Sequence, residues 1–207
     1  MSHPHQLSGK KLFFSIILNI TITVSQFIGG IISGSLALIS DAVHNLSDVI
    51  SLIISYVANI LTNRKQQTSQ QTFGYKRAEI VAAFINSASL IVIAVFLAFE
   101  AVKRLQNPVE LESNIVIVLA LLAIFANGFS VLLLKKDAHH NLNMKAAYLH
   151  LLSDMLTSVA VLIGGLLMKF YQIYWIDGVL TIIISAYLFF MSWHIFRDSL
   201  QILMLFA

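Results

Sequence analysis

The sequence predicts an all-α membrane protein with six transmembrane helices and both termini in the cytoplasm. Three observations support this fold class. Of the 207 residues, 58% are hydrophobic and only 11% are charged, whereas soluble domains carry about 25% charged residues. Six apolar stretches each reach the roughly 20 residues that a helix needs to cross the hydrocarbon core of a bilayer. The basic residues gather on one side of the predicted membrane.

The predicted helices follow one another with short polar connections. They span about residues 11–32, 36–61, 78–101, 115–134, 144–168 and 175–199 of a single transmembrane domain, residues 1–207. A Ser33-Gly34-Ser35 turn separates the first two helices. Asn107-Pro108 marks a turn after the third, because proline disfavours helix in the residue before it. Polar loops at about 62–72 and 135–143 complete the connections.

The distribution of Lys and Arg predicts the orientation. With six crossings, ten basic residues fall on one side of the membrane and three, Lys103, Arg104 and Lys169, on the other. Cytoplasmic loops carry an excess of Lys and Arg, so both termini are predicted to be cytoplasmic. The ten are Lys10, Lys11, Arg64, Lys65, Lys76, Arg77, Lys135, Lys136, Lys145 and Arg197.

Composition excludes several classes of function. There are no cysteines, which excludes disulfides, thiolate metal ligands and a cysteine nucleophile. The net charge of +3 is modest and its basic residues lie at the ends of apolar runs, which does not suggest nucleic-acid binding. Neither His-Glu-x-x-His nor Gly-x-Ser-x-Gly occurs, and we predict no enzyme, no catalytic residues and no bound organic cofactor.

Two matching segments lie inside the second and fifth predicted helices. His44–Asp48 (HNLSD) and His150–Asp154 (HLLSD) agree at four of five positions. A charged side chain at the bilayer centre costs roughly 2.5–3.5 kcal/mol, and neither aspartate has a basic residue within one helical turn. A bound cation is the direct way to balance these charges. The two helices run in opposite directions, as in inverted repeats that hold a transport site, although convergence on one ligand geometry gives the same pattern.

The spacing within each segment predicts a metal site. Residues four apart share a helix face, so His44 and Asp48 can hold one ion together with His150 and Asp154. Zinc is commonly held tetrahedrally by nitrogen and oxygen ligands, whereas calcium and magnesium require oxygen shells. Four protein ligands leave no open position for catalysis. For one pair alone, the alternative is a packed histidine hydrogen-bonded to a neighbouring helix, but two matched pairs favour the metal site.

Other polar residues inside the predicted helices have two interpretations each. Asp41, one turn before His44, either relays ions to the site or caps the N-terminus of its helix. Polar residues on one face of the first helix either line a hydrated path with Asn86 and Asn127 or form interhelical hydrogen bonds. That face comprises Asn19, Thr23, Gln26 and Gly30. Asp177 is predicted to lie near the outer membrane interface and not to bind metal.

Three segments in this order resemble the cation diffusion facilitator family, in particular its zinc-transporting branch. They are Ser40–Asp48, Phe73–Glu79 (FGYKRAE) and His150–Asp154. The resemblance implies a cation efflux transmembrane domain of six helices, a homodimer, and exchange of cytoplasmic zinc(II) for protons. It also implies a tetrahedral site formed by His44, Asp48, His150 and Asp154. The family usually adds a cytoplasmic domain after the sixth helix, and this sequence ends at Ala207, where we expect that domain to begin.

The sequence is compatible with other functions for the same four ligands. The same ligands suit a divalent metal channel, a transporter of cadmium, cobalt or iron(II), or a metal-dependent assembly protein. His139 and His140, in a predicted loop, are weak metal-binding candidates, because a solvated loop is the favoured explanation of these histidines. The expected location is the bacterial inner (cell) membrane.

Overall fold

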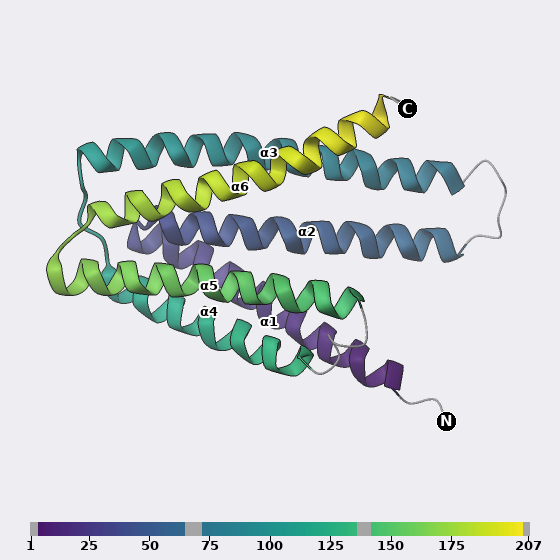
Figure 1. Cartoon of the computed structure of the whole chain (residues 1–207), viewed down its shortest axis with the longest axis horizontal. Helices are drawn as coiled ribbons and strands as arrows, with labels where there is room; N and C mark the ends of the chain where they lie inside the picture. Colours follow the sequence, from purple (N-terminus) through teal and green to yellow (C-terminus); the bar gives the residue numbers. More distant parts are fainter. Residues whose placement is uncertain (1–3, 65–71, 136–141, 205–207) are drawn as a thin grey trace.

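The computed structural model describes the backbone of residues 4–64, 72–135 and 142–204, and side chains within 16–50, 80–135 and 148–204. Consecutive helices alternate in direction, so α1 begins and α6 ends at the same end of the bundle (Figure 1). The helices within the described ranges are α1 (Pro4–Ser33), α2 (Leu36–Arg64), α3 (Thr72–Gln106), α4 (Ser113–Leu134), α5 (Leu142–Tyr171) and α6 (Trp175–Leu203).

The helices extend beyond the apolar stretches that predict them. The third predicted helix begins near residue 78, whereas α3 begins at Thr72 and continues to Gln106. Backbone hydrogen bonding does not require apolar side chains, so a helix continues into its polar flanks until a turn ends it. Lys103 and Arg104 lie in the last turn of α3, where cations interact favourably with the helix dipole.

Five helices contain described segments that are long and apolar enough to cross a membrane. These are Ile16–Ser33, Ile80–Gln106, Ser113–Leu134, Tyr148–Tyr171 and Trp175–Leu203. The side chains of α2 are described only as far as Ile50. Large apolar side chains cover the outside of the bundle, including Phe96, Phe125 and Phe190 at 63%, 72% and 71% exposed. In a membrane protein such a surface faces lipid.

The helix α2 occupies the centre of the bundle, where it packs against α1, α3, α5 and α6. The other extended contacts pair α3 with α6, α4 with α5, and α1 with α4. The largest apolar cluster among the described residues contains the small side chains of Ala37 and Ala120, packed with Leu38, Val116 and Met168. Small residues let the helix backbones approach closely, which is the usual basis of packing in membranes.

Two glycines fix the start of α2 against α1. Gly34 has a φ of 74°, a left-handed conformation that favours glycine, and this lets the chain reverse between the two helices. At Gly30, an added Cβ would lie 2.7 Å from Cγ1 of Ile39 and 3.1 Å from its backbone nitrogen. The α1–α2 crossing therefore requires the absence of a side chain at this position.

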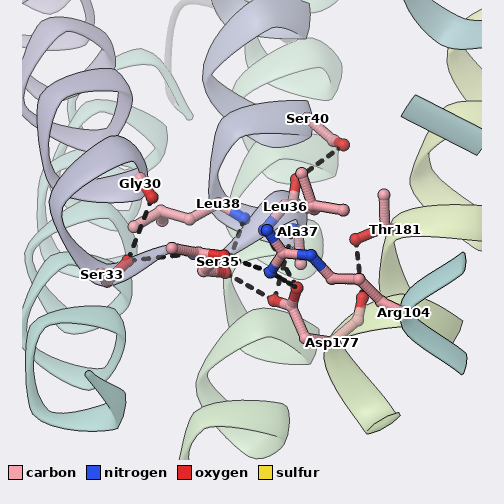
Figure 2. A network of polar contacts seen from close by, with 11 residues as sticks. Gly30, Ser33, Ser35, Leu36, Ala37, Leu38, Ser40, Arg104, Asp177 and Thr181 are labelled. Carbon is pink, nitrogen blue, oxygen red and sulfur yellow. Dashed lines mark hydrogen bonds and ion pairs between the residues drawn. The ribbon is translucent and has the colours of Figure 1, made fainter. Parts of the chain in front are cut away.

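A carboxylate from α6 caps the N-terminus of α2 (Figure 2). Asp177 accepts hydrogen bonds from the Ser35 hydroxyl at 2.6 Å, from the Leu36 amide at 3.0 Å and from the Ala37 amide at 3.3 Å. Arg104 of α3 lies 3.7 Å from the same carboxylate and also donates to the carbonyl oxygen of Gly34. The network joins the α1–α2 turn, α3 and α6, and so holds the helix that carries His44.

The environment of Asp177 differs from the prediction. Asp177 lies in the first turn of α6, at the end of the helix, but its side chain is only 1% exposed and therefore not solvated. The first four amides of a helix have no partner within that helix, and two of those at the start of α2, from Leu36 and Ala37, donate to the Asp177 carboxylate. Burial is tolerated because Arg104 and three hydrogen-bond donors surround the charge.

Candidate metal centre

The structure brings His44 and Asp48 of α2 together with His150 and Asp154 of α5. The Nε2 atom of His44 lies 3.6 Å from Oδ2 of Asp48 and 3.9 Å from Oδ1 of Asp154. The Nε2 atom of His150 lies 3.5 Å from Oδ2 of Asp48 and 3.4 Å from Oδ2 of Asp154. Each imidazole therefore faces both carboxylates, one from its own helix and one from the other.

These four His–Asp separations, which use both carboxylate oxygens of Asp154, are close to the edge length of a tetrahedral zinc site. With metal–ligand bonds of about 2.0–2.1 Å, the ligand atoms of a tetrahedron lie about 3.3 Å apart. The four His–Asp separations, at 3.4–3.9 Å, are at or slightly above that value. The ligand atoms of His44, His150 and Asp154 all lie within 4.8 Å of one another. Asp48 is not in that set, although its Oδ2 atom lies 3.6 Å from His44 and 3.5 Å from His150.

The carboxylates of this site contain buried oxygens without a hydrogen-bond donor and have no Lys or Arg partner among the described side chains. Oδ2 of Asp48 and both carboxylate oxygens of Asp154 are buried without a hydrogen-bond donor. Among the described side chains, their ion-pair partners are the two histidines, and no Lys or Arg pairs with them. Buried charges are ordinarily paired or coordinate metals. The donor set and its charge therefore fit a divalent cation.

One half of the site is buried and the other half is accessible. The side chains of His44 and Asp154 are 8% and 1% exposed, whereas those of His150 and Asp48 are 33% and 29% exposed. Asp48 follows His44 along α2, and His150 precedes Asp154 along α5. Both exposed residues therefore lie nearer the end of the bundle at which α1 begins and α6 ends (Figure 1). The more exposed ligands of the site are thus the two nearer that end.

A small cavity adjoins the site between α2, α3 and α6. Its volume is about 50 Å³, enough for a water molecule. Polar side chains in its wall include Ser47, Asn86, Ser87 and Ser192, beside His44 and Asp48 themselves. Asn86 of α3 donates a hydrogen bond to the Ser47 hydroxyl of α2 at 2.8 Å. The cavity offers polar groups to an ion that approaches the ligands.

The structure decides between the two interpretations of several polar residues. Asp41 is the sixth residue of α2, which has no acidic residue in its first turn, so Asp41 is not the N-cap. On α1, Gln26 donates an interhelical hydrogen bond to Asp41 at 2.7 Å, and Thr23 bonds to Asn19 within the helix. Gln26 and Asn86 therefore make interhelical hydrogen bonds of the kind that the second interpretation describes.

A third His-x-x-x-Asp pair, which sequence reasoning missed, shows that the spacing alone does not define a site. His194 and Asp198 of α6 lie 3.5 Å apart, between the 3.6 Å and 3.4 Å of the two central pairs. Their side chains are 81% and 54% exposed, and no second pair faces them among the described residues. A His-x-x-x-Asp pair contributes to a four-ligand site only when a second pair on a neighbouring helix packs against it.

Some predicted features lie outside the described residues. These are the side chains of Phe73–Glu79 and the loop that contains His139 and His140. The role of Asp177 as a cap was also missed. The signal available in the sequence was the pair of opposite charges, Arg104 and Asp177, predicted at the same end of the bundle.

Comparison with known proteins identifies the family. The family model of the cation efflux transmembrane domain matches residues 12–204. A cadmium, cobalt and zinc/H(+)-K(+) antiporter of Bacillus velezensis is 35% identical over 210 residues, which cover 99% of this chain and 67% of that protein. The metal cation efflux system protein CzcD of Cupriavidus metallidurans is 34% identical over 98% of this chain and 64% of its own length.

The zinc transporter ZitB of Escherichia coli is 31% identical over 96% of this chain and 63% of its own length. The chain thus spans about two thirds of the length of these relatives, which are named as metal cation transporters. The match covers all six helices, and the chain is an integral membrane protein. It belongs to the cation diffusion facilitator family, in the zinc-transporting branch.

Proposed function

We propose that this protein carries zinc(II) out of the cytoplasm in exchange for protons, with His44, Asp48, His150 and Asp154 as the ligands of the transported ion. The observation that supports this most is the set of four His–Asp separations of 3.4–3.9 Å across two helices. Two imidazole nitrogens favour zinc or a neighbouring transition metal over calcium or magnesium. The names of the relatives support metal efflux in general.

The proposed topology has all six helices crossing the membrane, with both termini in the cytoplasm. In this orientation the exposed half of the site, Asp48 and His150, faces the cytoplasm. The conformation is then the one that loads metal. Rocking of α2 and α5 relative to their neighbours opens the buried half, His44 and Asp154, to the other side, as in other alternating-access carriers.

Proton exchange follows from the ligand chemistry. Metal binding requires neutral imidazole and ionised carboxylate, so it releases protons. Protons that arrive from the outer side occupy the ligands and displace the metal there, and the protonated site returns to the cytoplasmic side. Asp41, one turn from His44, is proposed to relay ions to or from the site.

The proposed assembly is a homodimer in the bacterial inner membrane, with residues 1–207 forming the transmembrane domain. The bacterial sources of the relatives support this location. The Bacillus relative is named for exchange against both protons and potassium, so the identity of the counter-ion is an experimental question for this chain.

Transport in proteoliposomes tests the proposal. We expect zinc flux to rise with an opposing proton gradient, and Asp154→Asn to abolish flux while the protein still folds. The matched control is Asp198→Asn, because Asp198 has the same spacing to a histidine but is exposed. Flux that is indifferent to the gradient contradicts antiport. Flux retained by Asp154→Asn contradicts the site.

A metal panel in the same assay tests selectivity. We expect the wild type to prefer zinc, cadmium and cobalt, and His44→Asp to gain transport of metals that prefer oxygen, such as manganese. Saturation at micromolar zinc with slow turnover indicates a carrier. Flux that rises linearly with zinc concentration indicates a channel instead.

A further inference from the structure

The imidazole of His44 contacts an aromatic ring that lies outside the set of metal ligands. Tyr187 of α6 lies against it, with the two ring centroids 5.7 Å apart and the ring planes at 73°. This is an edge-to-face pair, within the range of centroid distances at which aromatic rings attract each other. The four ligands belong to α2 and α5, so the contact brings a third helix, α6, to the metal centre.

A histidine that binds metal requires a defined ring orientation. The χ2 torsion of histidine is broad, so the rotamer alone does not direct Nε2 at the ion, and groups around the ligand ordinarily fix its ring. The carboxylates of Asp48 and Asp154 lie 3.6 and 3.9 Å from Nε2 of His44, so both approach the atom that binds the metal. Tyr187 instead contacts the ring as a whole, and a ring in this position restricts rotation about χ2.

Tyr187 lies on a firmly packed part of α6. Its neighbours along the helix, Ile184 and Leu188, are 7% and 1% exposed, and each belongs to a buried apolar cluster that includes residues of α2. The Tyr187 side chain itself is 44% exposed, whereas that of His44 is 8% exposed. The tyrosine ring therefore covers the imidazole on one side and faces outward on the other, and the backbone that carries it is fixed against α2.

We propose that Tyr187 is a positioning residue of the metal centre, whose ring holds the imidazole of His44 so that Nε2 faces Asp48 and Asp154. This inference deepens the proposed zinc site and rests on it. Tyr187 does not touch the ion and acts through His44, so its removal leaves all four ligands in the chain. What is lost is the preorganisation of one nitrogen ligand, and a ligand that must first be ordered binds more weakly.

Zinc affinity of the purified chain in lipid nanodiscs, titrated with a competing dye, tests this role. Tyr187→Leu removes the ring, and because Tyr187 is partly exposed the change leaves no closed cavity. An aromatic pair changes an equilibrium constant about threefold to tenfold, so we expect zinc to bind at least about threefold more weakly. Tyr187→Phe keeps the ring and should bind zinc like the wild type. The matched control is Phe190→Leu, which removes a ring that is 71% exposed on the same helix and should leave the zinc affinity unchanged.

Two backgrounds show whether Tyr187 acts through His44. In His44→Ala there is no imidazole for the ring to hold, so adding Tyr187→Leu should change the zinc affinity by less than about twofold. In His150→Ala the imidazole of His44 is still present, so Tyr187→Leu should again weaken zinc binding by about threefold or more. A general disturbance of the helix bundle would weaken both backgrounds alike. Tyr187→Met, whose flexible side chain adapts to the available space, repeats the comparison with a second residue that has no ring.

Cobalt(II) in place of zinc reports the coordination geometry in the same samples, because four-coordinate cobalt absorbs visible light more strongly than six-coordinate cobalt. We expect strong bands for the wild type, Tyr187→Phe and Phe190→Leu, and weaker bands for Tyr187→Leu at saturating cobalt. Weak bands of six-coordinate cobalt in the wild type contradict the metal centre itself. A four-coordinate wild type whose affinity and spectrum are unchanged in Tyr187→Leu, or an equal loss of affinity in both histidine backgrounds, overturns the role of Tyr187 and leaves the metal centre standing.

Discussion

The cap formed by Asp177 gives a prediction whose magnitude follows from the structure. Asp177→Ala removes the acceptor of hydrogen bonds from Ser35, Leu36 and Ala37, at 2.6, 3.0 and 3.3 Å. Loss of a helix cap costs about 0.5–2 kcal/mol, and the buried Ser35 hydroxyl left without an acceptor costs about 1–3 kcal/mol. Arg104 also loses its ion pair, but it is 21% exposed, so we assign this loss about 1 kcal/mol or less.

Because these contributions share partners and are not additive, we expect Asp177→Ala to lower the free energy of unfolding by about 3 kcal/mol. Asp177→Asn keeps one acceptor oxygen and should lose roughly half as much. Equilibrium unfolding in mixed micelles of dodecyl maltoside and dodecyl sulfate measures both. Asp198→Ala, at an exposed carboxylate of the same helix, should stay within about 0.5 kcal/mol of the wild type.

A double-mutant cycle isolates the contact itself. We expect Ser35→Ala to cost much less in the Asp177→Ala background than in the wild type, with a coupling of about 1 kcal/mol or more. If Asp177→Ala is no more destabilising than Asp198→Ala, or the coupling is zero, the carboxylate does not hold α2 in place.

Three further perturbations have defined outcomes. Gly30→Ala places a Cβ 2.7 Å from Ile39 Cγ1 and should lower the free energy of unfolding by about 1–3 kcal/mol. The control is Gly128→Ala, whose added Cβ lies 3.5 Å from its nearest atom. This control should raise the unfolding midpoint slightly or leave it unchanged. Zinc affinity, titrated with a competing dye, should fall at least about tenfold from pH 7 to pH 6, because protonated ligands do not bind metal; an affinity independent of pH contradicts proton exchange at the site. Asn86→Ala removes the 2.8 Å hydrogen bond to Ser47 and should destabilise the protein by about 1 kcal/mol, and unchanged unfolding shows that the α2–α3 contact does not depend on it.

The sequence predicts much of this arrangement because two strong signals coincide. Hydropathy predicts the helices. The free-energy cost of burying the charged carboxylates of Asp48 and Asp154 in apolar segments indicates a bound cation. The turns at Gly34 and Pro108 are equally local signals, since each depends on one residue's backbone restrictions. These features are readable because each depends on a few neighbouring residues.

The remaining features depend on packing between distant segments. Asp177 lies 142 positions from Ser35 along the chain, and only the fold shows that it caps α2. Gln26 and Asp41 become partners through the crossing of α1 and α2. The exposed pair of His194 and Asp198 has the spacing of the central pairs, so sequence spacing does not separate a metal centre from a surface ion pair.

X-ray absorption of the zinc-loaded protein tests the proposed metal centre most directly. We expect four nitrogen and oxygen ligands at about 2.0–2.1 Å, with the multiple scattering of two imidazoles. In His150→Ala, one imidazole should disappear from the spectrum and zinc should bind more weakly. A shell of six oxygen ligands, or a spectrum unchanged in His150→Ala, would contradict a site formed by the histidines and aspartates of α2 and α5.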